Sequence, residues 1–205
     1  MPAELLLPFL AAVLLVELTP GPNMAYLAIV SGQWGRRAGL ATVIGVTAGL
    51  SVYMLATVFG LSQLVLRVEW IYAALRWSGV AFLLWLAWET WRGASADPTA
   101  TGDGSPRPLT LMTRGFLANV LNPKAALFYV GLVPGFTDPA RDFAGQALLL
   151  GALHIGVSIA IHVTIVLLAT RASGLLAIGA ARTVRRTFAL ALVAIALWLL
   201  WETRR

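Results

Sequence analysis

The sequence predicts an all-α polytopic membrane protein with six transmembrane helices, arranged as two inverted three-helix repeats whose first and fourth helices are broken. Two observations lead to this fold class: an apolar composition, and landmarks that recur in the same order in both halves. Of the 205 residues, 59% are hydrophobic and 12% are charged, and the mean hydropathy is +0.82. Soluble domains carry about 25% charged residues, so a water-soluble domain is excluded.

The composition also excludes several functions. The chain has no cysteine, which rules out disulfides, thiolate metal sites and cysteine nucleophiles, and its two histidines are too few for a histidine-rich metal cluster. No Gly-Lys pair occurs, so there is no phosphate-binding P-loop. The net charge of +6 comes from arginines between apolar segments, so we expect a membrane protein that binds neither nucleic acid nor a cofactor.

Six apolar segments are long enough to span a membrane, which requires roughly 20 residues. They cover residues 5–31, 39–66, 70–91, 114–135, 145–170 and 186–202. No basic residue precedes the first segment and no cleavage site follows it, so we expect a span there and not a removed signal peptide. With the N-terminus outside, the inner loops hold nine arginines and the outer segments four, which predicts that both termini lie outside.

The two halves of the chain resemble each other. Residues 1–92 form the first predicted repeat and 114–205 the second, joined by a flexible cytoplasmic linker over 93–113. The motif Trp-Glu-Thr lies at the end of both the third and the sixth span. Glycines six residues apart occur in the second and fifth spans, and prolines interrupt the first and fourth. Three spans per copy place the second repeat upside down, as in secondary transporters. Membrane-interface composition is the alternative explanation.

Both proline interruptions fall inside predicted spans. Pro20-Gly21-Pro22-Asn23 interrupts the first span and Asn122-Pro123-Lys124 the fourth. Asn122 is suited to cap the outgoing half-helix, with Pro123 at its first position. Breaks within hydrocarbon are tolerated where they line a polar cavity, and helix N-termini attract anions. We therefore expect a substrate carboxylate to bind between the two breaks.

Two charged residues lie near these breaks. Lys124 is the only lysine of the chain, and Glu17 is the only acidic residue deep in a span of the first half. A charge at such depth usually faces a cavity or a partner charge. Lys124 is suited to bind the substrate carboxylate, and Glu17 to bind an amino group or carry a proton. Alternatively, the two form a structural pair.

Other polar residues complete the predicted site. Asn119 and Tyr129 share a face of the fourth span with Asn122. On the fifth span, two histidines flank Ser158 at i, i+4 spacing, as in a proton relay, although a hydrogen-bonded packing role is the alternative. The predicted substrate-binding residues are Pro20, Gly21, Pro22, Asn23, Asn119, Asn122, Pro123, Lys124 and Tyr129; the candidates for proton coupling are Glu17, His154 and His162.

Three motifs resemble the LysE/RhtB family of amino-acid exporters. Residues 18–23 followed by 35–40 resemble its opening, 121–128 its second signature, and 75–79 its entry to the third span. The resemblance covers essentially the whole chain and implies a bacterial inner-membrane exporter of amino acids, driven by the proton motive force. It marks residues 20–23 and 122–124. Asn23 is neutral where many relatives have Asp, which favours Glu17 or a histidine as the proton carrier.

The predicted function is therefore a secondary transporter, and not an enzyme, that exports amino acids or close derivatives. Export of a divalent cation or an organic toxin is one alternative, but a cation site requires clustered carboxylates. An intramembrane enzyme or an assembly factor is the other, and no serine in the spans has a clear base beside it. Gly45 and Gly49 favour close helix packing within the chain, with a homodimer interface as the alternative.

Overall fold

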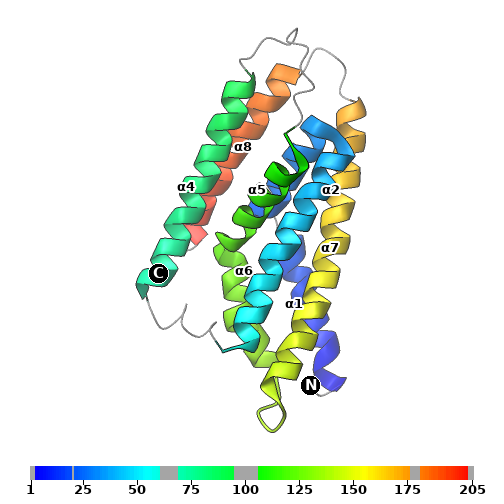
Figure 1. The fold of residues 1–205 in the computed structure, drawn as a ribbon, viewed down its shortest axis with the longest axis vertical. Helices are drawn as coiled ribbons and strands as arrows, with labels where there is room; N and C mark the ends of the chain where they lie inside the picture. Colours follow the sequence, from blue (N-terminus) through cyan, green and yellow to red (C-terminus); the bar gives the residue numbers. More distant parts are fainter. Residues whose placement is uncertain (1–2, 20, 61–68, 95–105, 176–180, 203–205) are drawn as a thin grey trace.

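The computed structural model describes residues 3–19, 21–60, 69–94, 106–175 and 181–202, and every element within these ranges is helical (Figure 1). The elements are η1 (Ala3–Leu5), α1 (Leu6–Leu18), α2 (Pro22–Val58), α4 (Glu69–Ala94), α5 (Pro108–Val120), α6 (Pro123–Leu127), η2 (Phe128–Leu132), η3 (Val133–Phe136), α7 (Phe143–Leu175) and α8 (Ala181–Glu202). The predicted all-α class is confirmed.

The long helix α2 folds back on itself at Gly35. This residue has φ 77° and ψ −175°, a conformation that glycine adopts without strain, and it separates helical pieces over 22–34 and 36–58. Gly39 lies directly against Ser31 Oγ, whereas residues eight positions apart in a straight helix are about 12 Å apart. Gly35 therefore takes the place of the longer loop expected between the first two predicted spans.

The two helix interruptions predicted from proline are both present. α1 ends at Leu18 and α2 begins at Pro22, while α5 ends at Val120 and α6 begins at Pro123. The second pair, Pro108–Val120 and Lys124–Phe136, is bent by 55°. The chain therefore interrupts two of its apolar helices near their middles.

Membrane-spanning length is clear for two to three helices of the described residues. By length and composition alone, Phe143–Ala172 and the stretch Asn23–Val58, which includes the fold at Gly35, are sufficient to cross a membrane, and the bent pair makes a third if it is counted as one span. Leu6–Leu18 and Trp77–Trp88 are shorter apolar helices. The protein is thus a helical membrane protein.

Two boundaries differ from the prediction. α5 begins at Pro108, so the residues 108–113 assigned to the linker are helical, because proline is well placed in a first helical turn. α2 ends at Val58 and not near residue 66, since Gly60 has φ 73° and turns the chain. Residues 61–68 and 95–105 lie outside the described part of the chain.

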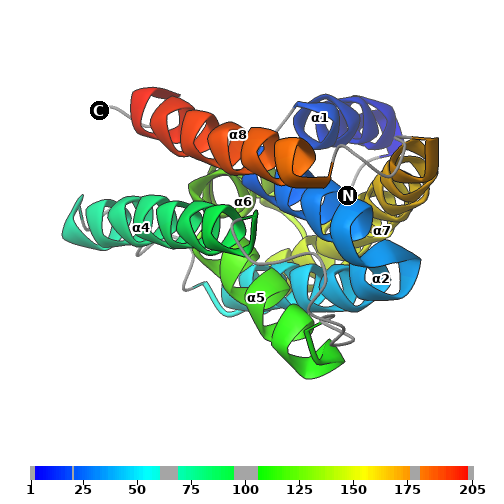
Figure 2. The same cartoon turned by 90° about the horizontal axis from the view of Figure 1, so that it is seen from above.

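α2 is the centre of the packing. It lies between α5 and α7, while α4 and α8 pack along each other in opposite directions (Figures 1 and 2). Glycines permit the closest approach between α2 and α5, because Gly45 meets the Met112 backbone and Gly115 meets the carbonyl of Thr42. The predicted close packing of Gly45 within the chain is confirmed.

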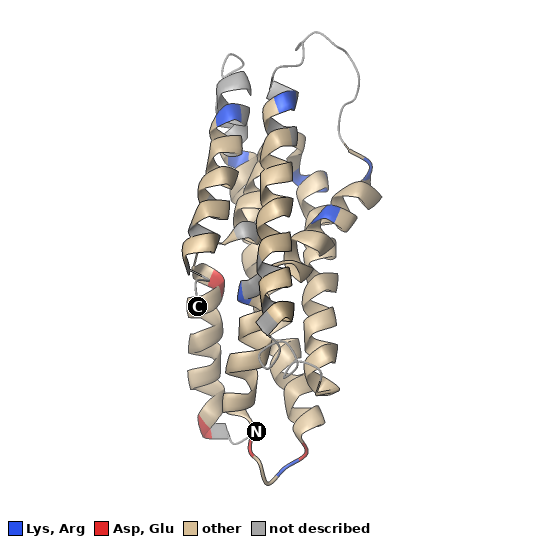
Figure 3. Ribbon diagram, turned by 90° about the vertical axis from the view of Figure 1, so that its left-hand side faces the viewer, with Lys and Arg blue, Asp and Glu red and all other residues tan. Residues whose placement is uncertain are grey.

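Apolar side chains cover the outside of the bundle. Leu7, Leu15 and Trp70 are each more than 70% exposed, at 76%, 73% and 71%. Such a surface suits a lipid environment, because exposing apolar side chains to lipid tails costs no free energy. Most of the basic residues coloured in Figure 3 lie toward the upper end of the molecule, away from the N-terminus, and others lie in the middle and at the lower end.

Candidate functional site

The two helix interruptions meet in space. Asn122 caps α6 as predicted: its Oδ1 accepts a hydrogen bond from the Lys124 backbone N–H at 3.0 Å, and proline occupies the first turn. At the other break, Gly21 is extended and α2 starts at Pro22. Both helix starts border one cavity, so the positive ends of their dipoles lie beside it, although the first-turn N–H groups of α6 already donate to Asn122.

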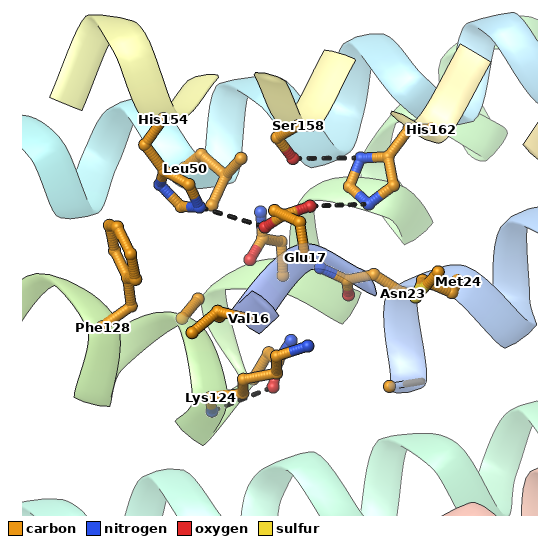
Figure 4. A pocket seen from close by; sticks show the side chains of 14 residues that line it. Val16, Glu17, Asn23, Met24, Leu50, Lys124, Phe128, His154, Ser158 and His162 are labelled. Atoms are coloured by element: carbon orange, nitrogen blue, oxygen red, sulfur yellow. Dashed lines mark hydrogen bonds and ion pairs between the residues drawn. The ribbon is translucent and has the colours of Figure 1, made fainter. Parts of the chain in front are cut away.

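The cavity has a volume of about 30 Å³ and lies between the breaks and α7 (Figure 4). Its lining consists of Val16, Glu17, Gly21, Asn23, Met24, Leu50, Asn119, Asn122, Lys124, Ala125, Phe128, His154, Ser158 and His162. Most of these side chains are polar, although the surrounding helices are apolar. Polar groups at such depth in a membrane protein mark a functional site. The space holds roughly two water molecules.

Glu17 lies between two histidines at one side of this cavity. His154 Nε2 is 3.0 Å from Glu17 Oε1, and His162 Nε2 is 3.7 Å from Glu17 Oε2. The three residues are 9%, 1% and 3% exposed, with Glu17 the most exposed. Both rings project from α7 toward the end of α1 (Figure 4). We call these three residues the acid–imidazole cluster; they are the three proton-coupling candidates of the sequence.

Neighbouring side chains hold the two rings. The Tyr129 hydroxyl is 3.1 Å from His154 Nδ1, and Ser158 Oγ is 3.3 Å from His162 Nδ1. The Phe128 ring stacks on His154 with its centroid 3.9 Å away. Tyr129 itself is fully buried and its hydroxyl contacts the cluster, so its described position is behind His154 and not in the cavity wall.

Lys124 connects the two breaks. Its Nζ donates a hydrogen bond to the Thr19 carbonyl at 2.7 Å. Thr19 is the C-terminal cap of α1, where carbonyls lack helical partners. Among the described contacts, Lys124 therefore bonds the backbone and Glu17 bonds the histidines, in place of the direct pair that was the sequence's alternative.

Two side chains complete the polar contacts of α5 near its end. Asn119 Nδ2 donates to the Val46 carbonyl at 2.7 Å, and the Tyr53 hydroxyl donates to the Val120 carbonyl at 2.6 Å. Both bonds tie α5 to α2. Within the described part of the chain, the Oδ1 atoms of Asn119 and Asn23 are buried and have no hydrogen-bond partner. Such buried, unpaired acceptors are rare in proteins.

The cavity gathers most of the predicted substrate-binding residues. Gly21, Asn23, Asn119, Asn122 and Lys124 line it, and Pro22 and Pro123 contribute the backbones that start α2 and α6. Pro20 lies outside the described residues.

The sequence analysis did not predict the apolar lining residues Val16, Met24, Leu50, Ala125 and Phe128, or the Thr19 carbonyl. Phe128 lies four residues after Lys124 and so on the same helical face, a spacing that was available in the sequence. Leu50, which also lines the cavity, and the Thr19 carbonyl had no comparable signal, because their roles depend on long-range packing.

Apolar helices that can cross a membrane, with a polar cavity where two helices are interrupted, define a membrane transport protein. The sequence comparison agrees with this class. The chain belongs to the LysE type translocator family, whose model matches residues 14–203. The family resemblance and the prediction of a membrane transporter are therefore confirmed.

The similarity to individual relatives extends over about three quarters of the chain. The homoserine/homoserine lactone efflux protein of Salmonella typhimurium is 30% identical over 157 residues, covering 77% of this chain and 76% of its own. The leucine efflux protein of Klebsiella pneumoniae is 27% identical over 152 residues, with 74% and 72% covered. An uncharacterized membrane protein of Vibrio cholerae is 28% identical over 151 residues, with 74% of each chain covered. No solved structure matches the chain.

Proposed function

We propose that the protein is a secondary transporter that exports amino acids or close derivatives across the bacterial inner membrane, driven by the proton motive force. The observation that carries this proposal is the cavity at the helix breaks, which gathers a lysine, a carboxylate and two histidines. The relatives named as efflux proteins for homoserine and for leucine support an amino acid as the exported solute.

The substrate carboxylate binds at the starts of α2 and α6. The N-terminal end of a helix carries a positive partial charge, which favours an anion. The Lys124 ammonium adds a full charge and already contacts an oxygen acceptor, the Thr19 carbonyl. A substrate carboxylate can replace that acceptor, so Lys124 can bind it without being left unpaired.

The acid–imidazole cluster carries the proton. Glu17 can exchange a proton with either imidazole, and histidine is the side chain best suited to change charge near neutral pH. The far nitrogens of the two rings contact Tyr129 and Ser158, so the path extends in two directions from Glu17. Since Glu17 lines the same cavity as Lys124, its charge state affects carboxylate binding, which couples proton and substrate.

Transport requires the cavity to open to each side in turn. At about 30 Å³ it is smaller than an amino acid, so the half-helices must move apart for substrate to enter. We infer six spans in two inverted repeats, 1–92 and 114–205, rocking about the cavity, with both termini outside. The matching interruptions before α2 and α6, the opposite directions of α4 and α8, and the basic end of the molecule support this architecture (Figures 1 and 3).

Export from living cells tests the proposal. Cells that express the wild type or Lys124→Met are loaded with amino acids by dipeptide feeding, and the amino acids that appear outside are measured with and without an uncoupler. We expect the wild type to release one or a few amino acids faster than cells without the protein. The increase should disappear in Lys124→Met and with the uncoupler.

Arg141→Met is the matched control, because it also removes a cation but one that pairs with Asp138 at an exposed site outside the cavity. It should export like the wild type. If no amino acid leaves the cells faster with the wild type than without it, amino-acid export is wrong, and the cavity serves another solute.

A further inference from the structure

Asn119 presents a buried oxygen acceptor to the cavity, and its orientation is fixed. The side chain is 0% exposed, and its Nδ2 donates to the Val46 carbonyl at 2.7 Å. A carbonyl can only accept, so the NH₂ group must face Val46 and the oxygen must face away from it. That oxygen has no hydrogen-bond partner among the described residues.

Asn23 presents a second acceptor of the same kind. It is 8% exposed, and its Oδ1 is likewise buried without a partner in the described part of the chain. It lines the cavity from the first turn of α2, on the side of Glu17 away from the histidines (Figure 4). Two unpaired acceptors in one small cavity suit a ligand that donates several hydrogen bonds.

The other charged groups of the cavity are already engaged. Lys124 only donates, and its ammonium is bonded to Thr19. The two carboxylate oxygens of Glu17 face His154 and His162. Among the described residues of the cavity, the two amide oxygens are the buried acceptors that have no partner, and a primary ammonium supplies three donors from one atom.

We propose that Asn23 and Asn119 form a neutral subsite for the α-ammonium group of the substrate. This assignment rests on the proposed function and deepens it, because it separates the group that Lys124 recognises from the group that the amides recognise. Recognition of the substrate ammonium by these amides does not depend on a free carboxylate in the substrate. The substrate class is thus small solutes with a free primary amine, including amino acids and their lactones or esters, and N-acylated amino acids are excluded.

Two matched series of probes test the subsite: L-homoserine, its lactone and N-acetyl-L-homoserine, and L-leucine, its methyl ester and N-acetyl-L-leucine. Binding is measured as a shift of melting temperature of the purified full-length protein in detergent. In at least one series, the free amino acid and its lactone or ester should stabilise the wild type, and the N-acetyl compound should not. Asn23→Leu and Asn119→Leu should each weaken binding of both amine compounds at least tenfold.

Three further variants identify which group each residue recognises. Asn23→Asp keeps an oxygen acceptor and should keep binding. Lys124→Met should weaken binding of the amino acid and spare its lactone or ester. Gln33→Leu removes an amide from the same helix but outside the cavity, and should behave like the wild type. Asn119→Leu also breaks the bond to Val46, so Asn23→Leu, which breaks no hydrogen bond known among the described residues, decides the result if Asn119→Leu does not fold.

The subsite is wrong if no amine-bearing probe stabilises the wild type or if the N-acetyl compounds bind equally well. It is also wrong if Asn23→Leu and Asn119→Leu both bind the probes as Gln33→Leu does. These results do not depend on export. Amine binding that requires Asn23, in a protein that exports no amino acid from cells, would refute amino-acid export and leave the subsite standing.

Discussion

Glu17 is held between two imidazoles, and this arrangement distinguishes the side chains that can change charge from those that only hold others in place. Glu17 and the two histidines are side chains of the kind that gain or lose protons, and Glu17 lies 3.0 Å from His154 and 3.7 Å from His162. Tyr129 and Ser158 contact the outer nitrogens of the rings and fix their orientation.

Replacing Glu17 should uncouple transport from the gradient. Glu17→Gln keeps the size of the side chain and a hydrogen-bonding oxygen but cannot carry a proton. We expect export against a concentration gradient to fall to the level of the wild-type protein in the presence of an uncoupler, while exchange of labelled amino acid at equal concentrations continues. Both rates are measured in proteoliposomes. Concentrative export by Glu17→Gln would remove Glu17 from the proton path.

Removing the Tyr129 hydroxyl should affect stability more than transport. Tyr129→Phe deletes one hydrogen bond, to His154, which lowers the free energy of unfolding by about 1 kcal/mol. Because the hydroxyl lies behind His154, the concentration of substrate that half-saturates export should not change. Thermal unfolding in detergent and export kinetics check the two parts. A changed half-saturating concentration at unchanged stability would place the hydroxyl in contact with substrate.

Local contacts of the site were predictable from the sequence, and long-range ones were not. The Asn122 cap depends on residues two positions apart, so the Asn-Pro-Lys order was sufficient to predict it. The Lys124 bond to Thr19 joins residues 105 positions apart, and the Asn119 bond to Val46 joins residues 73 apart. Such bonds depend on how the helices pack, which apolar periodicity does not encode when most of the surface faces lipid.

At the scale of elements, the contact between α2 and α5 depends on glycines. A Cβ at Gly45 would overlap the Met112 backbone, which cannot move aside like the end of a side chain. The hydrogen bonds of Asn119 and Tyr53 to backbone carbonyls also lie in this contact between α2 and α5. Small residues at this crossing therefore position the polar side chains beside the cavity.

Gly45→Ala should destabilise the protein strongly. Overpacking at a rigid contact costs about 1–3 kcal/mol or more, so we expect a clear loss of melting temperature and of folded protein. Gly156→Ala on α7 is the control, because nothing lies within 4 Å of an added Cβ there, and it should be neutral. Differential scanning fluorimetry on both variants measures the difference; equal stability would contradict the close packing.

The position of the turn within α2 could not be predicted from the sequence. A loop between the first two apolar segments was expected, but their ranges leave residues 32–38 between them and do not single out one residue as the turn. The structure uses the single residue Gly35, with φ 77°, and helix continues to both sides. A positive φ is required at only one position, and the choice of that position depends on tertiary contacts such as Gly39 against Ser31.

At the scale of the whole molecule, the proposed orientation in the membrane rests on the distribution of charge. Most of the basic residues coloured in Figure 3 lie toward one end of the bundle, and such an end is expected to face the cytoplasm. Composition and proline spacing were enough to predict the helical class and both interruptions. They could not predict that α2 lies between α5 and α7 while α4 packs with α8, since lipid-facing helices share similar apolar surfaces.

Single cysteines can test the orientation, because the chain contains none of its own. Arg37 and Arg141 are both exposed, and they lie in segments predicted to be inside and outside. In spheroplasts, a membrane-impermeant maleimide should label Arg141→Cys readily and Arg37→Cys only after the membrane is permeabilised. Unmodified protein is the blank. The opposite labelling pattern would mean that the termini lie in the cytoplasm.

The bond between Lys124 and the Thr19 carbonyl has a consequence for when the protein works. An arriving carboxylate must compete with an oxygen that the ammonium already holds at 2.7 Å. A hydrogen bond to a charged group contributes about 1.5–3 kcal/mol, so this competition weakens affinity by about 10-fold to 100-fold. We expect the protein to export little at ordinary cytoplasmic concentrations of its solute and to export it at an appreciable rate only when that solute accumulates.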